Sequence, residues 1–440
     1  MDSDCIPARW PCHGGSATPG GERISRPCDC AAAPIAQRSL PAIRRSPPMY
    51  RVSPFVRRFA WALLGGAGVA TVWANVSPAS YYDMIEWRFL DREMLTSLPF
   101  SQVLPDTFLL THVTLVSDVL MALFLFFVGK ELWEALVLER GALTGRQALL
   151  PAWAVAGGML GAVLFWVLYI IIGYVIARAV FGAGHPALHL SLLVSIASSL
   201  AGLLLAGIAD ATFGLALLWL LLPLGATLWA WLAFGRPDPD APERVRRRSL
   251  ALWPWLLAGA ASWIGVAAAG LPPALGLLPV IPAIPHADRA FGLFAEAEEF
   301  LHDPLNRLSH LLVKPLAVIL FAFGLTRGGI DLGALAPTTG SVLAALWIGK
   351  PLGFLAGALL AALLFRLDLP RGVRLSDLLL VAMISGVGFT LPVLALDSAL
   401  PGGAMAEAAR MGAALSLLLG PMVIALARLR RPPPASRAKT

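Results

Sequence analysis

The sequence predicts an all-α polytopic membrane protein with about 12 transmembrane helices. Of its 440 residues, 58% are hydrophobic and only 14% are charged, and the mean hydropathy is +0.73. Apolar runs of roughly 20 residues recur along the chain, which matches the thickness of bilayer hydrocarbon and exceeds what a soluble core needs. Because backbone polar groups in hydrocarbon must bond within their own segment, these runs are expected to be helices.

The apolar runs give the expected spans in chain order. They lie near 57–75, 108–128, 148–181, 187–208, 211–234, 250–270, 271–285, 310–326, 341–365, 377–396 and 408–428. The run 148–181 is too long for one crossing and is expected to supply two short ones. The run 271–285 is short and interrupted by prolines, which remove backbone donors and break helices.

Charges between the runs predict the orientation. Lysine and arginine cluster in 51–58, 130–146, 236–248, 366–374 and 428–439, whereas 81–106 and 397–407 lean acidic. Basic loops belong on the cytoplasmic side, so an even number of crossings must separate 130–146 from 236–248. This gives twelve crossings with both termini inside. Since the net charge of +7 falls in these gaps, it indicates topology and not a nucleic-acid partner.

The two ends of the chain differ from the apolar part. Residues 1–50 are rich in Gly, Pro and Arg and lack an apolar signal region, so they are expected to be a disordered extension. All four cysteines lie there, but one C-x-C pair (Cys28 and Cys30) has no partner ligands nearby, so neither a metal site nor a cofactor is predicted. The transmembrane domain is expected over 51–430, followed by a basic cytoplasmic tail, 431–440.

Four stretches of the chain are distinctive: "SDVLMALFLFFVGKELWEALVLERGALTGRQALLP" (117–151), "ILFAFGLTRGGIDL" (319–332), "LWIGKPLGFLAGALL" (346–360) and "GVGFTLPVLALDSAL" (386–400). They resemble the NhaA Na⁺/H⁺ antiporter family. With weaker matches in the right order, the resemblance covers about residues 55–428. It implies inverted repeats and two discontinuous helices that cross at the ion site, an architecture for which this family is itself a standard example.

The resemblance also implies activity, partners and location. It points to secondary transport of Na⁺, with Li⁺ as a further candidate ion, in exchange for H⁺. It implies no enzymatic reaction and no cofactor. The expected setting is the lipid bilayer of a bacterial inner membrane, with a multi-pass chain and both termini cytoplasmic. A homodimer is left open as an assembly.

Two charged residues match the family's ion site. A carboxylate at mid-bilayer is costly when ionised and empty, so it binds either a cation or a proton, and this competition couples the two fluxes. Asp118 matches an acidic residue of the family and is expected at the centre of 108–128; a protonated, hydrogen-bonded structural Asp is the alternative. Lys350 matches the family's lysine at the helix crossing; the alternative is a lysine whose head reaches the interface.

The family's two adjacent aspartates are absent. Ser198 and Ser199 stand in their place, and serine hydroxyls can offer lone pairs to Na⁺ but do not titrate in the physiological range. They are candidates for ion binding, or small residues that pack against a neighbouring helix, as "GGMLGA" (157–162) also could. Arg327 flanks a predicted span and is expected to be an interfacial anchor or a loop charge.

Four further residues are candidates for sensing pH: Glu131, Glu134, His302 and His310. The glutamates are expected at the cytoplasmic end of the second helix, and the histidines lie in a region that the family associates with pH response. Histidine titrates nearest to neutral pH. A solvated charged loop is the alternative for this region.

Two functions therefore follow from the sequence. The first is a Na⁺/H⁺ antiporter of sodium and pH homeostasis, in which Asp118 is the group whose charge changes. The second is a degenerate NhaA homologue that keeps the fold without Na⁺/H⁺ exchange and carries another solute or serves a non-transport role. Fold alone does not decide between them.

Overall fold

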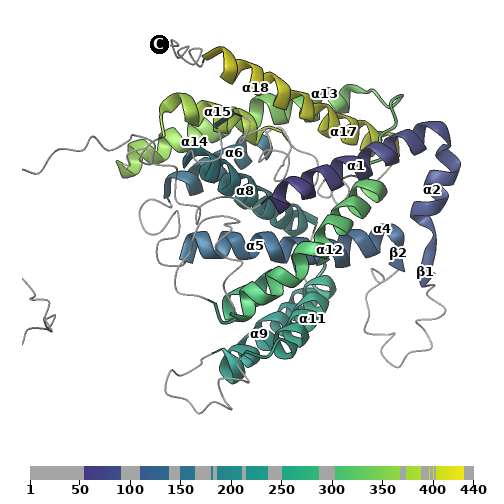
Figure 1. Cartoon of the computed structure of the whole chain (residues 1–440), viewed down its shortest axis with the longest axis vertical. Helices are drawn as coiled ribbons and strands as arrows, with labels where there is room; N and C mark the ends of the chain where they lie inside the picture. The colour runs from purple at the N-terminus through teal and green to yellow at the C-terminus, as the bar shows by residue number, and fades with distance from the viewer. Residues whose placement is uncertain are drawn as a thin grey trace, which may run out of the picture. The chain divides into compact units, whose positions relative to one another are not determined.

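The computed structural model describes residues 54–90, 110–137, 149–163, 180–181, 186–210, 215–235, 250–286, 303–366, 373–387, 396, 400 and 403–430 (Figure 1). All of them belong to one compact unit, Arg45–Thr440. The expected extension 1–50, the tail 431–440 and the second crossing expected within 148–181 lie outside the described residues, apart from Val180 and Phe181.

Helices make up almost all of the described chain. The α-helices are α1 (Phe55–Val76), α2 (Pro78–Glu86), α4 (His112–Thr114), α5 (Met121–Val137), α6 (Leu149–Val163), α8 (Pro186–Asp210), α9 (Leu221–Phe234), α11 (Trp253–Ala268), α12 (Pro304–Arg327), α13 (Pro337–Ala344), α14 (Lys350–Phe365), α15 (Leu375–Ser385), α17 (Gly403–Leu415) and α18 (Leu419–Arg430). Two π-helical segments are η3 (Leu115–Leu120) and η9 (Ala345–Gly349). The 3-10 segments are η5 (Leu215–Leu220), η6 (Pro273–Leu275), η7 (Leu278–Ala283) and η10 (Ser416–Leu418).

The predicted membrane architecture is confirmed. Within the described residues, seven helices are long and apolar enough to cross a membrane, and four shorter apolar helices accompany them. The proline-rich run 271–285 forms only 3-10 turns, as its prolines predict. One short element was not expected: the strand β1 (Arg88–Leu90) pairs antiparallel with β2 (Leu110–Thr111).

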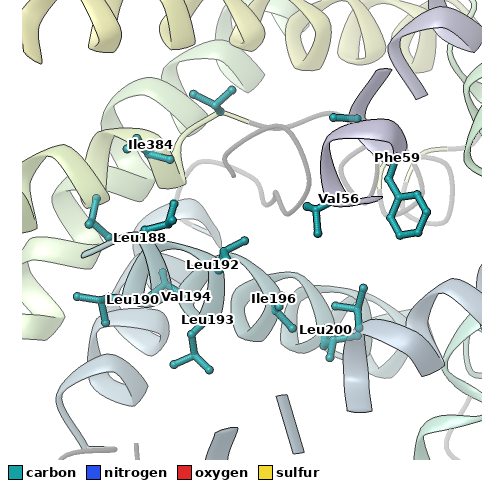
Figure 2. Close-up of a cluster of buried hydrophobic side chains, with 14 of the residues drawn as sticks. Val56, Phe59, Leu188, Leu190, Leu192, Leu193, Val194, Ile196, Leu200 and Ile384 are labelled. Carbon is teal, nitrogen blue, oxygen red and sulfur yellow. The ribbon is translucent and has the colours of Figure 1, made fainter. Parts of the chain in front are cut away.

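Helix α8 lies at the centre of the main hydrophobic core. Its apolar side chains are buried in several successive positions and meet Val56 and Phe59 of α1 and Ile384 of α15 (Figure 2). A helix that is apolar and buried around most of its circumference is typical of a core position. The stretch with the two serines is thus enclosed by protein on most sides.

Glycines set the two closest helix pairs, α1 with α12 and α6 with α14. A methyl group at Gly157 of α6 would collide with the Gly353 carbonyl and lie 2.6 Å from the Gly357 Cα of α14. On the other pair, Gly324 of α12 faces the backbone of α1 equally closely. Small residues let helix backbones approach in a membrane, so the packing interpretation of 157–162 is confirmed at Gly157.

The second span is displaced from its predicted position. The structure gives one continuous helical span, His112–Val137, instead of 108–128. Asp118 therefore lies near the start of the span and not at its centre. Lys130, which was expected in a basic loop, lies inside α5 and is fully buried.

Candidate ion site

Asp118 lies on η3, the π-helical turn that begins the second span. Its carbonyl accepts a hydrogen bond from Trp263 Nε1 of α11 at 2.8 Å, and its side chain is partly buried. The neighbouring Ser117 is buried and donates to the Val113 carbonyl at 2.7 Å. The carboxylate is thus held on a backbone that is tied to a second helix.

The π-helical turn has a local cause in the sequence. Thr114 Oγ1 donates to the Thr111 carbonyl at 3.2 Å, and Ser117 bonds four residues back. Such side-chain bonds compete with the backbone ladder and bend helices. Single π-helical turns are frequent at functional sites, which fits the position of Asp118.

Arg327 reaches this site, which corrects its interpretation as an interfacial anchor or loop charge. It is the last residue of α12, and its Nε donates to Ser117 Oγ at 2.9 Å. The guanidinium therefore contacts the residue that directly precedes Asp118 in the chain. The sequence places Arg327 at a helix end but does not show which neighbouring helix its side chain meets.

Lys350 is buried at 2% exposure in the middle of the continuous span Pro337–Phe365, so its head does not reach the interface. Among the described residues, neither Lys350 Nζ nor Trp347 Nε1, one turn earlier, has a hydrogen-bond partner. The π-helical segment η9 ends directly before Lys350. Pro351 lacks the N–H that would bond the Trp347 carbonyl, which accounts for a break in the ladder here.

The serines lie on α8. Ser198 is 3% exposed, and its Oγ donates to the Ser195 carbonyl at 3.1 Å. Ser199 belongs to the same helix, but its side chain is outside the described residues. Ser191 and Ser195 are also buried, and their spacing from Ser198 puts all three on one face of α8. This spacing of serines is visible in the sequence, but Ser191 and Ser195 were not predicted as site residues, because only the two positions that match the family's aspartates were considered.

The structure does not join all the predicted site residues. No hydrogen bond or ion pair links the described side chains of Asp118, Ser198 and Lys350 to one another. Their helices are connected through neighbours, since α5 packs on α8 and α6 packs on both α8 and α14. An ion shared by all three is therefore not part of the described geometry.

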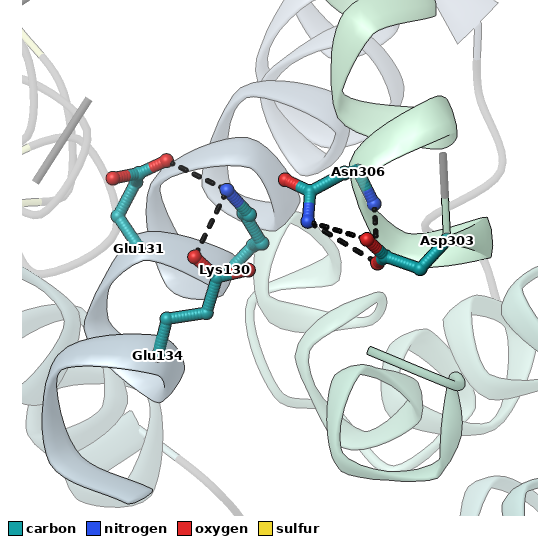
Figure 3. A network of polar contacts seen from close by, with 5 residues as sticks. All are labelled: Lys130, Glu131, Glu134, Asp303 and Asn306. Carbon is teal, nitrogen blue, oxygen red and sulfur yellow. Dashed lines mark hydrogen bonds and ion pairs between the residues drawn. The ribbon is translucent and has the colours of Figure 1, made fainter. Parts of the chain in front are cut away.

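Glu131 and Glu134 form a buried cluster with Lys130. The Lys130 ammonium lies 3.1 Å from Glu131 Oε1 and 3.1 Å from Glu134 Oε2, and all three side chains are almost inaccessible (Figure 3). The cluster is not a solvated loop. Lys130 was not predicted as the ion-pair partner of the two glutamates, because a hydropathy scale scores a lysine as exposed and does not include its pairing with carboxylates.

Beside this cluster, α12 begins with a second polar group. Asp303 caps the helix by accepting the backbone N–H of Asn306 at 3.2 Å, and the Asn306 amide donates back to the same carboxylate (Figure 3). Helix α12 packs against α5. Of the candidate histidines, His310 lies on α12, and His302 is outside the described residues.

A cavity of about 690 Å³ lies between α5, α6, α8 and the segments after α11. Its lining consists of Leu, Val, Ala and Pro side chains, including Leu132, Leu193 and Pro279. A monovalent cation needs oxygen ligands, which these side chains lack. The described lining therefore offers a cation no side-chain oxygen.

Comparison with known proteins identifies the family of this fold. The profile of the family described as Na+/H+ antiporter 1 matches residues 57–204 and 242–428. The chain belongs to the NhaA Na⁺/H⁺ antiporter family. It is 39% identical over 404 residues to "Na(+)/H(+) antiporter NhaA" of Jannaschia sp. (strain CCS1), which covers 84% of this chain and 95% of the relative.

Two further NhaA proteins align over a similar share of both chains. The chain is 30% identical to the protein of that name from Geotalea uraniireducens (strain Rf4) over 85% of the chain and 95% of the relative. It is 31% identical to "Na(+)/H(+) antiporter NhaA 2" of Pelobacter propionicus over 86% and 98%. The chain is thus a multi-pass membrane protein of a transporter family, not of an enzyme family.

Proposed function

We propose that this NhaA-family chain exchanges Na⁺, and Li⁺ as well, for protons, and that Asp118 is the group that binds them in turn. The observation that carries the proposal is a carboxylate on a π-helical turn, inside a helical span and beside Ser117 and Arg327. A carboxylate in low dielectric favours a bound cation or a proton over an empty charge. Competition between the two couples their fluxes.

Lys350 would act from a second position. It is buried and has no hydrogen-bond partner within the part of the chain that the structure describes, and a buried ammonium favours nearby negative charge. We propose that its charge balances the site when the cation leaves. Ser198 and Ser199 would supply neutral oxygen ligands to the passing ion.

The direct test is transport by the unmodified protein in proteoliposomes. An outward or inward gradient of Na⁺, Li⁺ or K⁺ is imposed, and the internal pH is followed with a fluorescent dye. The proposal expects a pH change with Na⁺ and Li⁺ that exceeds both the change with K⁺ and that of empty vesicles. Equal signals in all vesicles would contradict it.

The second candidate function is a homologue without exchange. It is favoured by Ser198, whose hydroxyl replaces a titrating acid and already bonds the Ser195 carbonyl within its own helix. The variant Ser198→Asp, Ser199→Asp separates the two functions. If the fold retains an inactive site, the added carboxylates create Na⁺-dependent flux in correctly folded protein; if Asp118 already suffices, Na⁺-dependent flux is present before the change.

We also propose a role in pH response, and a cytoplasmic orientation, for the charged C-terminal end of α5. Glu131 and Glu134, together with Lys130, would respond to pH on the cytoplasmic side, with His302 and His310 as further candidates. The basic loops support this orientation, in which both termini lie on the cytoplasmic side of a bacterial inner membrane. Neutralising Glu131 and Glu134 together is expected to change the pH dependence of transport, and an unchanged pH profile would contradict the role.

A further inference from the structure

The backbone on either side of Arg327 is fixed by two other helices. The Tyr81 hydroxyl of α2 donates to the carbonyls one and two residues before Arg327, at 3.4 and 3.1 Å. Thr71 Oγ1 of α1 donates to the carbonyl directly after it, at 3.2 Å. The last carbonyls of a helix have no partner within the helix, so these bonds hold the end of α12 in place.

Glycine packing seats this end directly against α1. Gly328, the residue after Arg327, approaches α1 so closely that a methyl group there would lie 2.8 Å from the Ala67 Cα. Gly324, one turn earlier, meets the α1 backbone in the same way. The start of the Arg327 side chain is therefore set by the fold and not by its own flexibility.

From this fixed origin the guanidinium is directed to η3. Its Nε bonds Ser117 Oγ at 2.9 Å, and Ser117 is itself held by the Val113 carbonyl. Because Ser117 directly precedes Asp118 on η3, the guanidinium charge lies close to the Asp118 carboxylate. The geometry thus puts a positive charge beside Asp118.

We propose that Arg327 is a resident counter-charge of the Asp118 site and sets its affinity for Na⁺. Without an ion, the guanidinium stabilises the ionised carboxylate. An entering Na⁺ brings a second positive charge next to Arg327, which repels it, so binding is weakened. The inference depends on the proposed function of Asp118 as the ion ligand and adds a positioning residue that tunes it.

The test compares three variants of the full chain in proteoliposomes. Arg327→Gln removes the charge and is expected to lower the KM for Na⁺ about tenfold, which corresponds to about 1.4 kcal/mol. Arg327→Lys keeps the charge and is expected to leave the KM close to that of the unmodified protein. Arg410→Gln is the control, because Arg410 is a partly buried arginine paired with Glu407 on α17.

A purely structural role predicts a different result. Loss of packing would lower the maximal rate of Arg327→Gln without lowering its KM, and Arg327→Lys would not rescue it. The double variant Asp118→Asn, Arg327→Gln lacks the proposed ion ligand, so its melting temperature is expected not to respond to Na⁺ at the low concentrations at which Arg327→Gln responds. An unchanged or raised KM in Arg327→Gln would overturn the proposal.

Na⁺ binding separates this proposal from the proposed transport. The melting temperature of purified protein in detergent is measured against Na⁺ concentration, since a bound ion stabilises the folded state. Arg327→Gln is expected to respond at about tenfold lower Na⁺ than the unmodified protein, even if no flux is found. Equal responses, or no response in either protein, would overturn the role of Arg327, whereas absent flux alone counts only against exchange.

Discussion

The contact between α6 and α14 offers a test with two adjacent glycines. Gly157 faces α14 so closely that a methyl group would lie 2.8 Å from the Gly357 nitrogen and collide with the Gly353 carbonyl. These are backbone atoms and cannot rotate away. At Gly158 the nearest atom would be the Phe354 Cβ at 3.5 Å, which is an ordinary contact.

The two alanine variants are therefore expected to differ in sign. Replacing a helical glycine with alanine gains up to about 1 kcal/mol from helix propensity. At Gly158 this gain stands alone, so Gly158→Ala is expected to stabilise the protein slightly. At Gly157 overpacking costs about 1–3 kcal/mol and outweighs the gain, so Gly157→Ala is expected to destabilise.

The assay is thermal unfolding of purified protein in detergent, followed by tryptophan fluorescence and by recovery of the monodisperse peak on size-exclusion chromatography. Gly157→Ala should melt below the unmodified protein, and Gly158→Ala at or above it. Equal melting temperatures for the two variants would refute the close approach of α6 to α14.

Three other perturbations have defined outcomes. Lys130→Met leaves two buried carboxylates without their cation and is expected to lower the free energy of unfolding by about 3–5 kcal/mol. The triple variant that adds Glu131→Gln and Glu134→Gln should largely restore this stability. Both are measured by the same melting assay, and an unchanged melting temperature in Lys130→Met would count against the cluster. Burial raises the pKa of Tyr81 to about 12, so the stability that its neutral hydroxyl contributes is complete below pH 10 and is lost as the pH rises through about 12. The melting temperature of Tyr81→Phe should therefore depend less on pH in that range. The same slope of melting temperature against pH in both proteins would contradict this burial. A single coupling carboxylate holds one Na⁺ or one proton at a time, so a K⁺ diffusion potential should leave the exchange rate unchanged, and a voltage-dependent rate would require a second titrating group.

Hydropathy predicted most of the fold, because hydrocarbon thickness and backbone bonding leave little choice of structure for long apolar runs. The second span was misplaced at its end, since Lys130 pairs with both Glu131 and Glu134, which allows the helix to continue in the interior. A hydropathy sum treats each of these charges as a reason to leave the membrane. Pairing between side chains is a property of the folded helix.

The candidate site was predicted only in part. Asp118 and Lys350 were selected from the sequence because an ionisable residue inside an apolar run is conspicuous, and their roles at an ion site remain predictions. The contact of Arg327 with Ser117 was not predicted, since a residue at the end of a span gives no sign of the helix that its side chain meets. The two π-helical turns also escaped prediction: at η3 hydroxyl bonds compete with the backbone ladder, and at η9 a missing proline N–H interrupts it.

Sodium-driven proton flux through the variant Asp118→Asn tests the central claim most directly. Asparagine keeps the size of the side chain and removes the charge that alternates between cation and proton. In proteoliposomes with matched amounts of folded protein, the Na⁺-dependent pH change is expected to fall to the level of empty vesicles. Flux that persists at the rate of the unmodified protein would show that another group couples Na⁺ to H⁺.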